Sequence, residues 1–170
     1  MPTEQLLVYI LLGGLALVLA VAILRGFRGL LGPAPLPYFS KDRLLSKGEL
    51  AFYRVLRQVL PPSLSASMKV RLCDVIGCTG AGWRSGFGAK ISQKHIDFVL
   101  VDAATTDIRL AIELDDRTHQ RPDRRDRDTF VDRALATAGV PILRVPAAAR
   151  YDPAALKGHV NAALRRSGGA

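Results

Sequence analysis

The segment HIDFVLVDAATTDIRLAIELDDRTH, residues 95–119, contains two apolar runs separated by a polar turn. The runs 96–101 and 108–114 have the length and composition of strands, so the segment predicts a β-hairpin that turns at 103–107. Both runs carry acidic residues, which strands normally avoid. A carboxylate on a half-buried surface costs free energy unless something compensates its charge. The hairpin therefore predicts a site as well as a sheet.

The predicted register brings three carboxylates together. If the turn is centred on Thr105, Asp97 lies opposite Glu113, and the Cβ atoms of facing residues are about 4.5–5.5 Å apart. Asp115 lies two residues beyond Glu113 and shares its face. Clustered carboxylates repel one another, and a hard cation that binds oxygen ligands, Mg²⁺ or Mn²⁺, would compensate them. The alternative is that arginines of the same domain neutralise these acids.

Two elements are expected before the hairpin. Ser46 to Glu49 has the spacing of a capping box and begins an amphipathic helix that ends before Pro61. The alternating residues Val70–Val75 predict a strand. The five glycines in residues 77–88 predict a loop, in which Trp83 is expected as a core or flap aromatic, with stacking on a nucleic-acid base as the alternative.

Three elements are expected after it. Residues 122–138 predict a charged helix that ends at Gly139, and residues 141–145 predict a short strand. Asp152 and Pro153 begin a last helix that runs to about Arg166. The order helix, three strands, helix, strand, helix predicts an α/β fold in which helices flank a mixed sheet.

The N-terminal segment predicts one transmembrane helix before this domain. Leu6 to Leu24 contains no charged residue and is long enough to cross a bilayer. Arg25 and Arg28 follow it and Glu4 precedes it, so the C-terminal side is expected in the cytoplasm. A signal peptide is the alternative, but the leader lacks a basic start. We expect an anchor at 1–28, a Pro/Gly linker at 29–43 and a domain at 44–170, in a single-pass inner-membrane protein.

The residues after the span are strongly basic. All 24 Lys and Arg lie there with 14 of the 15 Asp and Glu, which gives that part a net charge of +10. Such a domain is attracted to nucleic-acid phosphates or to anionic lipid headgroups. Cys73 and Cys78 are too few for a structural zinc site, and the expected cytoplasmic location argues against a disulfide, so we expect two small buried thiols.

An ordered set of motifs resembles a known group of enzymes. IDFVLVD, IELDDRTH, RDTFVDRAL and AGVPILRV, within residues 44–151, resemble the PD-(D/E)XK nuclease superfamily with its restriction-endonuclease-like fold. They are most similar to its very-short-patch-repair branch and to an uncharacterised, often membrane-anchored bacterial domain family. The resemblance implies a restriction-endonuclease-like mixed sheet and a metal-dependent nuclease.

The resemblance also implies roles for particular residues. Asp97 and Glu113 would hold Mg²⁺ or Mn²⁺, and Asp115 and His119 would assist catalysis. Other positions would be accessory to the site, and these are Glu49, Lys94, Asp128 and Arg133. The capping box gives Glu49 a competing structural role, and a backbone-bonded loop position gives His119 one.

The sequence departs from the superfamily pattern at one position. The lysine expected two residues after Glu113, which orients water or stabilises charge, is replaced by Asp115. Lys90 or Lys94 would supply the missing amine from a different position in the sequence.

Arginines follow the acidic core. Arginine binds phosphate with two parallel hydrogen bonds, so several arginines are candidates for gripping a nucleic-acid backbone: Arg117, Arg121, Arg124, Arg125 and Arg144. The interleaved aspartates make a solvated, self-neutralised helix the alternative for about half of the arginines in 117–133.

The sequence therefore predicts a membrane-anchored, metal-dependent endonuclease, with DNA as its favoured partner and substrate. One alternative is a catalytically inactive nucleic-acid-binding module with the same fold. Another is a membrane-surface interaction domain that binds anionic lipid and does not use the acidic cluster.

Overall fold

The computed structural model describes residues 3–30, 36–115 and 122–167, without the side chains of 28–30, 122–128 and 167. Its contacts divide the chain into two units, Met1–Asp42 and Arg43–Ala170. The first unit contains α1 (Thr3–Leu30). The span Thr3–Phe27 has a mean hydropathy of 2.9 and none of it is buried, so by length and composition α1 can cross a membrane.

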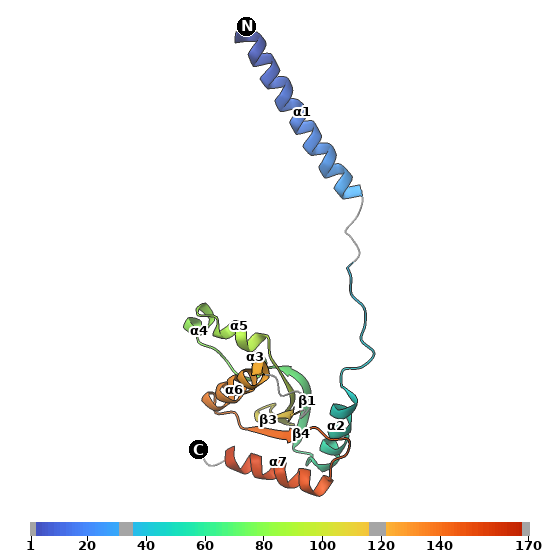
Figure 1. Ribbon diagram of the computed structural model, residues 1–170, viewed down its shortest axis with the longest axis vertical. Coiled ribbons are helices and arrows are strands. Elements are labelled where there is room, and N and C mark those ends of the chain that lie inside the picture. The colour runs from blue at the N-terminus through green and yellow to red at the C-terminus, as the bar shows by residue number, and fades with distance from the viewer. Residues whose placement is uncertain (1–2, 31–35, 116–121, 168–170) are drawn as a thin grey trace. The chain divides into compact units, whose positions relative to one another are not determined.

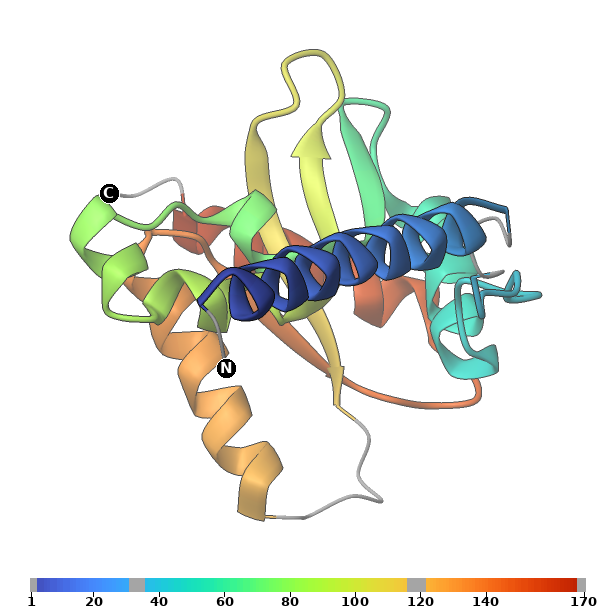
Figure 2. The same ribbon diagram turned by 90° about the horizontal axis from the view of Figure 1, so that it is seen from above.

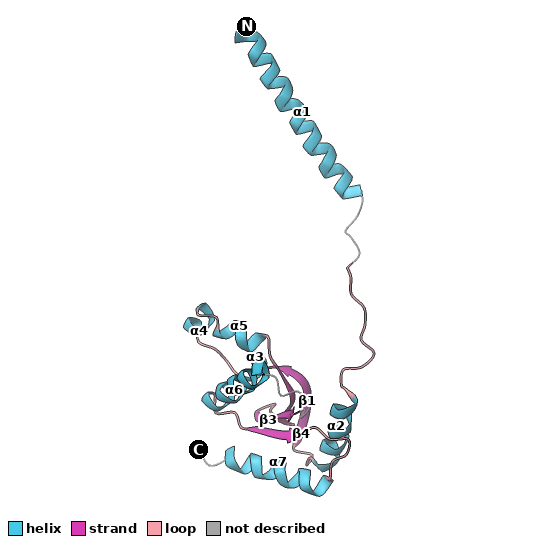
Figure 3. Cartoon of the chain, viewed as in Figure 1, coloured by secondary structure: helices cyan, strands magenta, loops and turns pink. Residues whose placement is uncertain are grey.

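The second unit is built on a four-stranded mixed sheet, shown in magenta in Figure 3 and labelled in Figure 1. Its strands are β1 (Leu64–Arg71), β2 (His95–Asp102), β3 (Ile108–Asp115) and β4 (Ile142–Pro146), in the spatial order β1-β2-β3-β4. The first three strands pair antiparallel, and β4 pairs parallel to β3. The predicted α/β class with a mixed sheet is confirmed.

One face of the sheet is covered by α2 (Lys47–Val59) and α7 (Pro153–Ser167). Phe52 and Leu56 from α2 and Val160 from α7 pack against Phe98 and Ile112 in the first hydrophobic core. Both helices begin as predicted. The Ser46 hydroxyl accepts from the Glu49 N–H while the Glu49 carboxylate accepts from the Ser46 N–H, and Asp152 accepts from the Ala154 N–H.

The other face is covered by α3 (Leu72–Val75), α5 (Phe87–Ser92) and α6 (Pro122–Thr137). A second core joins side chains of all three helices to the sheet: Leu72, Val75, Ile91, Ile96, Val99, Ala111, Val131 and Leu135. In both views, α5 and the adjoining α4 (Gly80–Arg84) lie beside α6 (Figures 1 and 2). The predicted helix stop at Gly139 is confirmed by its left-handed backbone, φ 72°.

The predicted hairpin register is also confirmed. Phe98 pairs with Ile112 and Leu100 with Leu110, as a turn centred on Thr105 requires. The register shifts only after Leu100, where Val101 pairs with Ile108.

Two predicted elements were wrong. The strand lies at Leu64–Arg71, not at Val70–Val75, because Leu72 and Val75 bury one helical face and so form a turn of helix. β1 was missed because small and polar residues, not β-branched ones, fill most of it. The glycine-rich segment predicted as a loop contains α4 and α5.

The predicted burial of the two thiols was also wrong. Cys73 and Cys78 are free, as expected, but each is only half-buried. Both belong to the margin of the second core, where the short helices after β1 leave the sheet.

Phe98 is the aromatic centre of the first core. It is fully buried, and its ring centroid lies 5.2 Å from that of Phe52 and 5.9 Å from that of Tyr53. Phe98→Ala should lower the free energy of unfolding by about 3–5 kcal/mol, because it leaves a cavity beside the rings of Phe52 and Tyr53. Urea denaturation of the full-length protein in micelles, followed by circular dichroism, would measure this. Phe39→Ala, at an 87% exposed position, should change nothing; equal effects would contradict the core assignment.

Candidate functional site

Three strand ends meet where the sequence places the acidic residues. β1 ends at Arg71, β2 begins at His95, and these two residues pair. Asp97 lies two residues into β2, directly before Phe98, and Glu113 directly follows the Ile112 that pairs with Phe98. The candidate residues of three strands therefore share one end of the sheet.

A lysine that sequence reasoning missed is the centre of this site. The Lys69 Nζ donates to Glu49 Oε1 at 2.5 Å and to Asp97 Oδ1 at 2.8 Å. We call Glu49, Lys69 and Asp97 the Lys69 cluster; their side chains are 18%, 29% and 16% exposed. Asp97 Oδ2 also accepts from the Leu114 N–H at 3.0 Å, which ties the cluster to β3.

Lys69 has an unusual backbone conformation for this role. Its φ is 54°, in the left-handed region that non-glycine residues seldom occupy. The conformation lies where β1 changes sides: Met68 packs on the first core and Val70 on the second. The same change occurs opposite, between Ile96 and Phe98. Such local strain persists only when surrounding contacts hold it, and it is concentrated at functional sites.

The pKa values within the cluster follow from these contacts. Burial raises the pKa of Glu49, but its hydrogen bonds from Lys69 and Ser46 outweigh burial and leave the pKa below its ordinary value. Burial lowers the pKa of Lys69, but its bonds to Asp97 and Glu49 outweigh burial and raise it. Lys69 is therefore a permanent cation at neutral pH and not a proton acceptor.

Asp115 belongs to a different ion pair. Arg144 on β4 donates to Asp115 Oδ1 at 2.6 Å through Nη1 and to Asp132 Oδ1 on α6 at 2.9 Å through Nη2. Burial lowers the pKa of Arg144, and its hydrogen bonds to Asp132 and Asp115 outweigh that effect and raise it. The guanidinium predicted to grip nucleic acid is thus engaged by two carboxylates.

The predicted convergence of three carboxylates is not what the structure shows. Asp97 is linked through Lys69 to Glu49 on α2, whereas Asp115 is linked through Arg144 to Asp132 on α6. These two helices cover opposite faces of the sheet, and the side change in β2 sends Asp97 to the α2 side. Among the residues that the structure describes, no group of three or more His, Cys, Asp or Glu could hold a metal ion.

Glu113 is half-buried between the two linkages. It follows Ile112 and precedes Leu114, and both of these neighbours pack on the first core, so its own side chain belongs to the opposite face. It also takes part in an interaction within the domain.

The candidate residues offer donor atoms of the type that the expected metal binds. Asp97 and Glu113 offer carboxylate oxygens, which Mg²⁺ prefers. In the described arrangement, however, Asp97 gives one oxygen to Lys69 and the other to a backbone N–H. A divalent ion at Asp97 therefore competes with the Lys69 ammonium for the same carboxylate.

The remaining predicted site residues lie elsewhere or outside the described part. Lys94 places its Nζ 5.4 Å from the centre of the Phe130 ring, and Arg133 lines a pocket beside α6. Lys69, not Lys90 or Lys94, contacts Asp97. The predictions for Arg117, His119 and Arg121, and for the side chains of Arg124, Arg125 and Asp128, fall outside the described residues.

Removing the Lys69 ammonium should destabilise the fold. Lys69→Met leaves Glu49 and Asp97 as neighbouring, partly buried carboxylates, which should lower the free energy of unfolding by about 2–3 kcal/mol, between the values for exposed and buried pairs. Arg71→Met is the matched control, because Arg71 lies on the same strand and pairs with Asp74 at the surface. Urea denaturation would compare them, and equal losses would contradict a special role for Lys69.

The effect of Lys69→Met should depend on pH in two windows. The lowered pKa of Glu49 stabilises the wild type above its ordinary value of 4.5, and this contribution is lost as pH falls through the folded pKa. The raised pKa of Lys69 stabilises the wild type at pH values below its ordinary pKa of 10.5. This contribution is lost as pH rises through the folded pKa. The stability difference from the variant should be constant near neutrality and shrink at both extremes in a pH series. A difference that grows in acid would refute the assignment.

Comparison with known proteins identifies a family for the domain. No curated protein and no solved structure matches the chain. One family model does match, over residues 41–164, and its description is a protein of unknown function, DUF2726. The match runs from just before α2 into α7 and so covers every strand of the sheet. Because it extends over most of the chain, the chain belongs to the DUF2726 family.

Proposed function

We propose that the α/β domain binds nucleic acid and hydrolyses its phosphodiester bonds, with DNA as the favoured substrate. The observation that carries this proposal is the Lys69 cluster. An ammonium is held between two carboxylates by a left-handed backbone, at the end of the sheet where Asp97 and Glu113 lie. A mixed sheet flanked by helices supports the restriction-endonuclease-like fold that the sequence resemblance implies.

Lys69 supplies the amine that the sequence pattern lacks. The superfamily lysine is replaced by Asp115, and Lys69 reaches Asp97 from a different strand, β1. Since its pKa is raised, Lys69 keeps its proton at Nζ and acts as a fixed positive charge. A fixed charge of this kind stabilises the negative charge that develops on a phosphate in the transition state.

Asp97 and Glu113 are the ligands that the resemblance implies for the divalent ion. Their side chains belong to opposite faces at this end of the sheet, so sharing one ion requires them to turn toward one another, and Glu49 would then receive the Lys69 ammonium. When bound, Mg²⁺ or Mn²⁺ polarises a phosphate oxygen and lowers the pKa of a bound water. Asp97 is positioned for this role by the Leu114 N–H. Arg144 holds Asp115 by an ion pair, so Asp115 assists by fixing the end of β3 to β4 and α6.

The anchor gives the proposed enzyme its location. α1 is long and apolar enough to cross a membrane. Arg25 and Arg28 follow its apolar part, so we propose that the α/β domain is cytoplasmic in a single-pass inner-membrane protein. The net charge of +9 for the whole chain supports attraction to nucleic-acid phosphates.

A second candidate function is a nucleic-acid-binding module without catalysis. It is favoured by the compensation of Asp97 and Asp115 by Lys69 and Arg144, which gives these carboxylates a structural role. It is also favoured because the described residues form no three-membered metal-binding group.

A cleavage assay separates the two. Full-length protein in detergent micelles would be incubated with plasmid, linear and single-stranded DNA and with RNA, in Mg²⁺, Mn²⁺ or EDTA. Metal-dependent cleavage should fall by about 100-fold or more in Asp97→Asn, Glu113→Gln and Lys69→Met, because each removes a charge at the reacting phosphate. Asp74→Asn, at an exposed acid paired with Arg71, is the matched control and should cleave normally.

The outcomes are distinct. Cleavage that survives all three substitutions would locate the chemistry elsewhere or in a contaminant. Salt-sensitive binding without cleavage by any of the proteins would establish the binding module and leave the Lys69 cluster as a structural ion pair.

A further inference from the structure

The segment between β1 and β2 exposes two aromatic side chains. Trp83 on α4 is 51% exposed and Phe87 on α5 is 53% exposed. In the described part of the α/β unit, two other large apolar side chains are exposed, Leu44 and Ile108. Two exposed aromatic side chains on consecutive short helices indicate a contact surface.

The Trp83 ring is held in place. A Cβ added at Gly88 would lie 2.0 Å from a carbon of that ring, so Gly88 is the residue that lets the indole pack on the backbone of α5. One part of the ring is thus fixed while half of the side chain stays open to solvent. A ring fixed in this way loses little conformational entropy when a ligand stacks on it.

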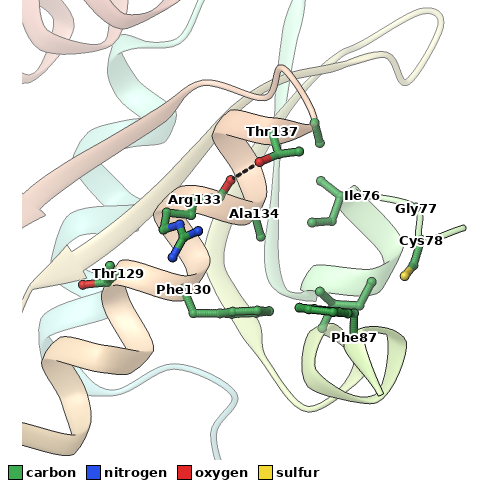
Figure 4. Close-up of a pocket in the computed structure, with 11 residues that line it drawn as sticks. Ile76, Gly77, Cys78, Phe87, Thr129, Phe130, Arg133, Ala134 and Thr137 are labelled. Atoms are coloured by element: carbon green, nitrogen blue, oxygen red, sulfur yellow. Dashed lines mark hydrogen bonds between the residues drawn. The ribbon is translucent and has the colours of Figure 1, made fainter. Parts of the chain in front are cut away.

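A groove lies between this segment and α6. Its volume is about 650 Å³, and its lining includes Ile76, Phe87, Ile91, Phe130 and Arg133. Figure 4 shows Phe130 from α6 and Phe87 from α5 pointing toward one another, while Arg133 lies on the Thr129 side. We call this feature the aromatic groove. Its size is that of a small-molecule or nucleotide-base site.

A lysine ammonium lies near each of the two phenylalanine rings of the groove. The Lys90 Nζ lies 5.2 Å from the centre of the Phe87 ring, and the Lys94 Nζ lies 5.4 Å from that of Phe130. Among the residues that the structure describes, no acidic side chain lines the groove. Within the described part of the chain, no ion pair engages Lys90, Lys94 or Arg133. Alternating rings and free cations suit a ligand that alternates bases and phosphates.

The groove is attached to the end of the sheet that carries the Lys69 cluster. The segment between β1 and β2, which forms one side of the groove, leaves the sheet after Arg71 and returns at His95. These two residues pair. The Leu72 N–H donates to the Lys94 carbonyl at 2.8 Å and closes the base of the segment. Asp97 follows two residues after this point, so the base of the segment adjoins the strand that carries the candidate site.

We propose that the aromatic groove binds unpaired bases, so that the domain acts on single-stranded nucleic acid or on strands with unpaired bases. This inference rests on the nucleic-acid binding of the proposed function. Bases would stack on Phe87, Phe130 and Trp83, and phosphates would meet Lys90, Lys94 and Arg133. A membrane-surface contact would use protruding side chains, whereas Phe87 and Phe130 face one another across a concave site.

Binding in EDTA tests the inference without cleavage. Full-length protein in micelles would be titrated with labelled oligo-dT of about 20 nucleotides, longer than a typical single-strand site, and with a duplex of equal length. Trp83 is the only tryptophan, so oligo-dT should quench its fluorescence. Phe87→Leu keeps apolar bulk but removes the ring, and should weaken oligo-dT binding roughly 10-fold. Lys90→Met should reduce the salt dependence of binding.

Two matched variants control for nonspecific effects. Ile108→Leu changes an exposed apolar residue at the hairpin, and Lys157→Met removes an exposed cation on α7. Both should bind oligo-dT as the wild type does. Equal binding of oligo-dT and duplex, with no effect of Phe87→Leu, would overturn the stacking groove.

A lipid-binding measurement and the cleavage assay distinguish the remaining outcomes. If phosphatidylserine in proteoliposomes shifts Trp83 emission to the blue while oligo-dT leaves it unchanged, the surface contacts the membrane and the inference is wrong. Quenching by oligo-dT without any cleavage supports the groove and refutes the hydrolysis. Cleavage of duplex with no quenching and a normal Phe87→Leu variant refutes the groove alone. Absence of nucleic-acid binding overturns both.

Discussion

The ammonium of Lys69 between two carboxylates is the constraint on which the site end of this domain depends. Partly buried carboxylates from a helix and from a strand repel one another, and a cation between them removes this repulsion. Lys69 provides that cation and adopts a left-handed backbone to do so. The same contact joins α2, β1 and β2, and Asp97 extends it to β3 through the Leu114 N–H. Helix placement, sheet pairing and site charge are therefore parts of one arrangement.

The two faces of the sheet give the acidic residues different environments. Asp97 belongs to the α2 side, where Lys69 neutralises it, and Asp115 belongs to the α6 side, where Arg144 does. Each of these two acids is thus compensated locally, which explains how the strand ends tolerate them. The two cations also have different roles: Lys69 places a positive charge beside Asp97, whereas Arg144 joins β3, β4 and α6.

The proposed nuclease and the aromatic groove place complementary features at one end of the domain. The Lys69 cluster offers a fixed cation and carboxylates for the chemistry of a phosphate, and the groove beside α6 offers rings and free cations for the bases and backbone that flank it. Membership of the DUF2726 family covers this whole arrangement, because the match includes every strand and the helices on both faces. An apolar α1 would restrict the domain to a membrane surface.

Local signals in the sequence determined the membrane-length helix, the capping box at Ser46, the hairpin register and the helices around Gly139 and Asp152, because caps, turns and apolar periodicity act within a few residues. They did not reveal β1, whose small and polar residues lack a strand pattern, nor the helices within the glycine-rich segment. Tertiary structure alone decided the site: Lys69 is 28 residues from Asp97 and 20 from Glu49 along the chain. Which face each carboxylate occupies depends on a change of side in β1 and β2 that alternation does not predict. Long-range pairing of charges, rather than local pattern, determines which cation compensates which acid.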